Sequence, residues 1–134
     1  MYIKTFLQYN IQMSYDKMKD YVESLFNVFH MINENESVKK DRRFQIIALV
    51  IFNYVRKMAK DNDVNLKDVQ IKKPINLMPV FEYISHNNIE LYDFNNISLQ
   101  DVDVTKNDDL ERYVLTHVYY ITQKAKADAM KQQI

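Results

Sequence analysis

The feature that most constrains the fold is an uninterrupted run of seven apolar residues, 46–52. Consecutive apolar residues cover a helix on every side, so other elements must bury such a segment. The run is too short to cross a membrane, which takes about 20 apolar residues. Its β-branched content also suits a buried strand, but the residues that follow it keep a helical spacing. We therefore expect a helix over residues 37–60 that is enclosed along its middle.

The size and composition of the chain are those of one globular domain, with 134 residues, 47% hydrophobic and 27% charged. We predict a single helical domain over residues 1–134, with residues 1–10 as an arm or as the first turns of the next helix. The 18 basic and 18 acidic side chains give a formal net charge of zero, so bulk charge gives no attraction to nucleic acid or to a membrane. No secretory signal is visible, and we expect a cytoplasmic protein.

Cysteine, glycine and tryptophan are absent, and the first two absences exclude several kinds of site. Without cysteine there can be no disulfide, thiolate metal site or thiol nucleophile. Without glycine there can be no P-loop, dinucleotide-binding fingerprint or nucleophile elbow, because each needs close backbone approach or positive φ. Positions with positive φ should then fall to Asn. The abundance of Lys, Asn, Ile and Tyr is typical of an AT-rich coding sequence, such as that of a phage, another virus, a mobile element or a low-GC bacterium.

A periodic stripe precedes the apolar run, with apolar residues at alternating spacings of four and three. Its members are Ile11, Tyr15, Met18, Val22, Leu25, Phe29 and Ile32. One interpretation is a coiled-coil dimer. We favour a bundle helix, because the large side chains at 15 and 29 and the apolar neighbours of the stripe widen it beyond a narrow seam. This helix should pair antiparallel with helix 37–60 across a turn at residues 33–37.

The second half contains an internal similarity, since residues 64–84 align without gaps to residues 97–117 at an offset of 33. Chance resemblance is the simpler interpretation, and a true repeat is the alternative. Each copy would be a short element, near 64–72 and 97–104, followed by a helix. The short elements read as one-turn helices or as short strands. We prefer one-turn helices, because no strong strand elsewhere could extend a sheet.

Two further helices complete the predicted fold. One spans about residues 77–86, with Pro79 in its first turn and Asn residues at 87–88 to end it. The other spans about residues 108–132, with an acidic first turn and lysines near its end. The predicted class is mostly α, a bundle of about four main helices around a buried central helix, 37–60.

Four basic residues lie at the start of the predicted central helix, where the helix dipole disfavours each cation by about 0.3–1 kcal/mol. They are Lys39, Lys40, Arg42 and Arg43. One interpretation is an anion site for nucleic-acid phosphates or an acidic protein surface. The alternative is a solvated face that is balanced by neighbouring acidic residues.

The histidines and a pair of tyrosines are the other candidate functional side chains. The histidines lack metal-binding spacing, so we expect no metal site, and His117 should be a hydrogen-bonded core residue. The consecutive Tyr119 and Tyr120 cannot both face the core. Because tyrosine is enriched at binding hot spots, this pair is a candidate protein interface.

No catalytic or cofactor-binding residue can be named from these patterns. We therefore expect a non-enzymatic interaction or accessory protein that binds a larger protein or itself, without metal, cofactor or membrane. A nucleic-acid-binding regulator that uses the basic helix start is the first alternative. A small enzyme of unknown class is the second.

Overall fold

A computed structural model describes residues 13–103 and 105–132, so the predicted arm at residues 1–10 lies outside the described residues. The described residues form helices joined by loops and contain no strand. The helices are α2 (Tyr15–Glu34), α3 (Glu36–Lys39), α4 (Arg42–Asp61), α5 (Met78–His86) and α6 (Asn107–Gln132), with the short 3-10 helices η1 (Leu66–Asp68), η2 (Phe94–Asn96) and η3 (Leu99–Asp101). A mostly α bundle of four main helices is therefore confirmed.

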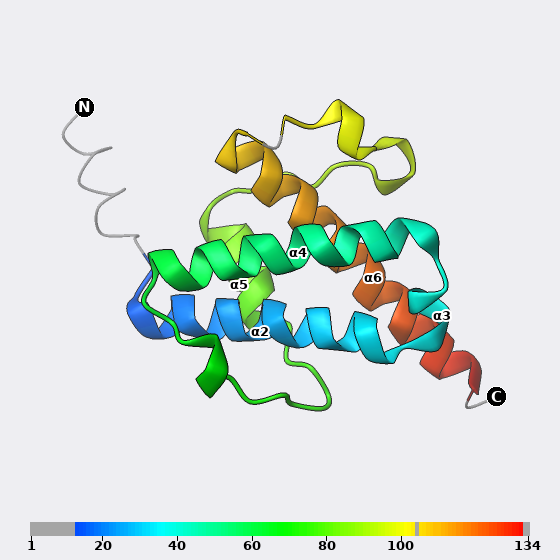
Figure 1. Ribbon diagram of the computed structural model, residues 1–134, viewed down its shortest axis with the longest axis horizontal. Helices are drawn as coiled ribbons and strands as arrows, with labels where there is room; N and C mark the ends of the chain where they lie inside the picture. The colour runs from blue at the N-terminus through cyan, green and yellow to red at the C-terminus, as the bar shows by residue number, and fades with distance from the viewer. Residues whose placement is uncertain (1–12, 104, 133–134) are drawn as a thin grey trace.

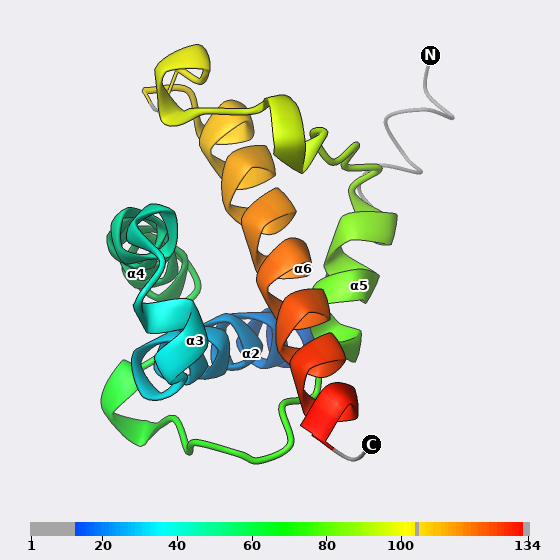
Figure 2. The ribbon, with the colours of Figure 1, turned by 90° about the vertical axis from the view of Figure 1, so that its right-hand side faces the viewer.

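The four main helices are arranged around one helical hairpin. Helices α2 and α4 lie side by side and run in opposite directions, as predicted for a helical hairpin (Figure 1). Helix α6 crosses this pair and lies between α4 and α5 (Figure 2). Helix α5 packs against α2. The core therefore lies where α6 passes over the hairpin.

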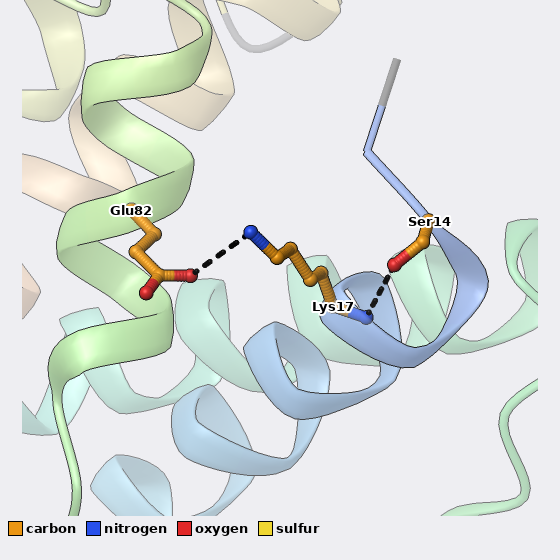
Figure 3. A network of polar contacts seen from close by, with 3 residues as sticks. All are labelled: Ser14, Lys17 and Glu82. Carbon is orange, nitrogen blue, oxygen red and sulfur yellow. Dashed lines mark hydrogen bonds and ion pairs between the residues drawn. The ribbon is translucent and has the colours of Figure 1, made fainter. Parts of the chain in front are cut away.

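A serine, Ser14, lies directly before α2 as its N-cap, and serine is favoured at this position. The Lys17 N–H donates to Ser14 Oγ at 3.3 Å, which satisfies one of the free donors of the first turn (Figure 3). The Lys17 Nζ lies 3.9 Å from Glu82 Oε2 on α5, but both side chains are exposed. Such surface pairs contribute little, so packing rather than this ion pair joins α2 to α5.

The helix that is enclosed on every side along part of its length is α6. All six residues from Tyr113 to Val118 are buried. The two polar ones bond within their own helix, because Thr116 Oγ1 donates to the Arg112 carbonyl at 2.8 Å and His117 Nδ1 donates to the Tyr113 carbonyl at 2.8 Å. This internal bonding lets polar side chains occupy a core position. The prediction of a hydrogen-bonded core histidine is confirmed.

Helix α4 is not enclosed, which corrects the prediction of a buried central helix over residues 37–60. Ile46 is 55% exposed and Leu49 is 67% exposed, whereas Ile47 and Ile51 on the opposite side are buried. The physical reason is position, because α4 lies at the edge of the molecule and has neighbours on one side only (Figure 2). An apolar run indicates where hydrophobic residues are, but not how many elements surround them.

The predicted helix 37–60 is also divided, since α3 ends at Lys39 and α4 starts at Arg42. The Gln45 Nε2 donates to the Lys39 carbonyl at 2.9 Å and so bonds a carbonyl at the end of α3. Asp41, a residue type favoured at helix starts, comes directly before α4, and its carbonyl accepts from the Phe44 N–H at 3.0 Å. The local sequence thus starts a new helix rather than continuing the old one.

The two short elements predicted in the second half are 3-10 helices, η1 and η3, and not strands. Both are stabilised by the residue before them. Asn65 Oδ1 accepts from the Lys67 N–H at 3.0 Å, and Ser98 Oγ donates to Asp101 Oδ2 at 3.0 Å. The same kind of element therefore occurs at both positions, while the internal repeat itself stays a prediction.

Two residues among those described have positive φ, Asn88 at 51° and Asp63 at 55°. Asn88 follows α5, where the sequence predicted that asparagine would replace glycine. After α4 the residue with positive φ is an aspartate, Asp63, instead of an asparagine. Aspartate shares the tolerance of asparagine for this region, because its short polar side chain bonds locally.

Two leucines on different helices test which helix is central. Leu115→Ala on α6 removes a fully buried side chain and should lower the free energy of unfolding by about 2–5 kcal/mol. The matched Leu49→Ala on α4 should change it by no more than about 0.5 kcal/mol. Urea unfolding of both variants measures this, and equal losses would contradict the described packing.

Candidate protein-interaction surface

One side of α4 faces away from the bundle, and we call it the α4 outer face. Its residues recur every three or four positions, so they share one side of the helix. All are exposed, and they are Arg42, Ile46, Leu49, Asn53, Arg56 and Lys60. The face therefore has an aliphatic pair near its middle and basic side chains at both ends.

Basic charge is concentrated around this face. Residues 39–60 contain seven basic side chains and one acidic one, whereas the rest of the chain contains 11 basic and 17 acidic ones. The net charge of zero therefore conceals two regions of opposite sign. At 0.1 M salt a charge acts over about 10 Å, so a partner that approaches the α4 outer face meets a positive local potential.

The predicted basic cluster is divided by the break between α3 and α4. Lys39 lies in the last turn of α3, where the helix dipole favours a cation. The dipole argument therefore applies only to the first turn of α4, where Arg42 lies. Arg42 belongs to the α4 outer face, and Lys39 and Lys40 are exposed just before it in the sequence. The side chain of Arg43 lies outside the described part of the structure, and anion binding by this cluster stays a prediction.

The tyrosine pair on α6 is exposed at both positions, Tyr119 by 44% and Tyr120 by 37%. Tyr120 stacks on Phe94 with ring centroids 3.6 Å apart and lies 6.0 Å from the ring of Phe44, in the first turn of α4. Tyr119 instead meets Phe81 of α5 edge to face at 6.2 Å. Tyr120 is thus near the basic end of α4, while Tyr119 belongs to a different neighbourhood. Their role as an interface stays a prediction.

A polar network in the interior joins one residue from each main helix. Glu111 Oε2 of α6 accepts hydrogen bonds from Tyr54 of α4 and from Tyr83 of α5, both at 2.6 Å. The hydroxyls of Tyr54 and Tyr21 of α2 are 2.9 Å apart. The rings of Tyr21 and Tyr83 stack with centroids 3.9 Å apart. We call these four residues the tyrosine–glutamate network.

Burial keeps the hydroxyls of this network protonated. It raises the pKa of Tyr21 and of Tyr54 well above the ordinary value, and neighbouring tyrosine and glutamate raise both further. Burial and the hydrogen bond to Glu111 also raise the pKa of Tyr83. A hydroxyl with such a pKa is far from the range that suits acid–base catalysis near neutral pH. We therefore assign a stabilising role to the network.

Sequence reasoning missed the exposure of Ile46 and Leu49 and the partners of Glu111. A signal for the first was present, because polar residues precede and follow the aliphatic pair on the same helix face. No local signal existed for the second. The tyrosines that bond Glu111 lie 57 and 28 positions away in the sequence, and only the tertiary fold brings them together.

The tyrosine–glutamate network predicts that stability falls in alkaline solution. The unfolded tyrosines ionise near pH 10, but the folded ones ionise only at higher pH, so their contribution is complete below pH 10 and is lost as the pH rises. Tyr54→Phe should make the fall in unfolding free energy above pH 10 less steep by about 1.4 kcal/mol per pH unit. Urea unfolding measured from about pH 9 to about pH 11, a range that spans the ordinary tyrosine pKa, gives the slope. A variant with the wild-type slope would contradict the role of Tyr54.

In the described parts of the chain, no three His, Asp or Glu side chains are grouped so that they could hold a metal ion. No helix there has both the length and the hydropathy that a membrane span needs. Comparison of the chain with protein-family models, with curated proteins and with solved structures finds no match.

Proposed function

We propose that this chain is a non-enzymatic interaction protein that binds an acidic protein surface through the α4 outer face. The observation that carries the proposal is the exposure of Leu49 (67%) and Ile46 (55%) between the basic ends of that face. The inner side of α4 already supplies its share of the core, so the fold does not require these two side chains. Exposed aliphatic side chains with a polar rim are typical of interaction sites.

The chemistry of the α4 outer face defines the partner. Leu49 and Ile46 would be covered by an apolar contact, and such burial supplies most of the binding free energy. Arg42 at one end and Arg56 and Lys60 at the other would meet carboxylates, which favour rapid association and the correct orientation. An amphipathic helix with acidic flanks has both features, so we name it as the partner class.

Nucleic acid is the alternative partner, favoured by the exposed Lys39, Lys40 and Arg42. Phosphate contacts come from basic and polar groups, and single-stranded bases stack on aromatic side chains. The aliphatic pair at the middle of the face supplies neither contact. An acidic protein surface therefore accounts for the whole face, whereas nucleic acid accounts only for its basic ends.

A designed peptide tests the aliphatic part of the face. The probe is a fluorescent amphipathic helix with leucines on one side and glutamates on the other, and its counterpart has lysines in place of the glutamates. The chain should bind the acidic peptide and not the basic one. Ile46→Ser/Leu49→Ser should raise the Kd by about tenfold or more, since a loss of about 1.4 kcal/mol in apolar contact is tenfold in affinity.

The matched control is Met78→Ser, which changes an exposed apolar side chain on α5 (58% exposed) and should leave the Kd unchanged. Fluorescence anisotropy gives the Kd, and circular dichroism checks that each variant is folded. Wild-type affinity in the double serine variant would contradict the proposal.

Removal of basic side chains tests whether the charged end of the α4 outer face contributes to binding. Lys39→Gln/Lys40→Gln/Arg42→Gln should weaken binding of the acidic peptide and should make the Kd less dependent on salt, because fewer charges are screened. Duplex DNA serves as the competing probe. The nucleic-acid alternative would be favoured if the chain bound DNA in a salt-dependent way and did not bind the acidic peptide. In that case the glutamine variant should lose DNA binding, and the double serine variant should keep it. Light scattering that shows a dimer dispersed by the serine changes would identify a second copy as the partner.

A further inference from the structure

A cavity of about 700 Å³ lies between α2, the loop after η1, α5 and the second half of α6. This size is within the range of small-molecule sites. Its apolar lining comes from Met31, Ile71, Pro74, Ile75, Leu77 and Phe81. The loop that forms one wall passes beside α2 in Figure 1. We call this space the loop cavity.

The loop wall is fixed by two buried polar side chains of α2. Asn27, 5% exposed, accepts from the Lys72 N–H through Oδ1 at 2.6 Å and donates to the Gln70 carbonyl at 3.3 Å. Ser24, 7% exposed, donates to the Asn76 carbonyl at 2.9 Å. Both ends of the wall are therefore held by hydrogen bonds in the folded chain. A preformed cavity costs a ligand little ordering of the protein.

The charged side chains that line the loop cavity are three lysines and one glutamate. Lys73 Nζ lies 2.6 Å from Glu34 Oε2, and this hydrogen bond lowers the pKa of that carboxyl. Among the described residues, Lys72 and Lys126 have no carboxylate within 4.0 Å. The lining therefore combines apolar side chains with two lysines that are in no ion pair with another described residue.

We propose that the loop cavity binds a small anionic amphiphile, an aliphatic chain that ends in a carboxylate. The chain would lie against the apolar lining, and Lys72 and Lys126 would attract the carboxylate as mobile point charges. A cationic amphiphile would meet the same lysines and be repelled. This proposal concerns a different surface from the α4 outer face and does not depend on the proposed function.

Calorimetric titration with three eight-carbon probes tests the ligand class. The probes are octanoate, neutral octanol and octyltrimethylammonium, each below its micelle-forming concentration. Octanoate should bind with a stoichiometry of one and at least tenfold more tightly than the cation. Lys72→Gln/Lys126→Gln should raise the Kd for octanoate about tenfold and leave that for octanol unchanged. The matched control Lys67→Gln, an exposed lysine of η1 outside the lining, should change neither.

Two further variants locate the site. Ile71→Ser alters a lining side chain that is already 42% exposed, so the fold should tolerate it, and it should weaken both octanoate and octanol. Ile46→Ser/Leu49→Ser should leave octanoate binding intact, which separates the loop cavity from the α4 outer face. The proposal is overturned by absent binding, by several octanoates per chain, by insensitivity to the Lys72→Gln/Lys126→Gln change, or by loss of binding in the α4 variant.

Discussion

The bundle depends on the Glu111 carboxylate, which accepts hydrogen bonds from tyrosines of α4 and α5. A hydrogen bond to a charged acceptor contributes about 1.5–3 kcal/mol, and here two of them meet at one oxygen. Through Tyr21 the network also reaches α2. Helix α6 carries the shared acceptor and lies between α4 and α5, and α4 lies at the edge of the bundle (Figure 2).

The surface of the protein follows from this arrangement. An aliphatic helix at the edge of a bundle buries one side and exposes the other, and in α4 the exposed side includes Ile46 and Leu49. The acidic residues lie mostly outside residues 39–60, so this face stays positive although the whole chain is neutral. The α4 outer face thus combines the apolar contact and the charge on which the proposed recognition of an acidic partner rests.

The spacing of apolar residues and the residues that start or stop helices predicted the helices well, because these signals are local. Pro79 lies in the first turn of α5 and Asn88 follows its end at positive φ, as the sequence indicated. The depth of each helix could not be predicted in the same way. Residues 46–52 are more apolar than Tyr113–Val118, yet the latter are enclosed. The bonds of Thr116 and His117 to their own helix permit this burial. Burial depends on neighbours that are distant in the sequence.

The most direct test is thiol labelling, which the absence of natural cysteine makes unambiguous. Leu49→Cys and Val114→Cys each introduce a single thiol, one on the α4 outer face and one in the enclosed part of α6. The account predicts that in the isolated folded chain Leu49→Cys reacts with a maleimide as fast as in urea, while Val114→Cys reacts only after unfolding. It also predicts that the acidic peptide slows the reaction of Leu49→Cys. Equal protection of both thiols in the isolated chain would contradict the account.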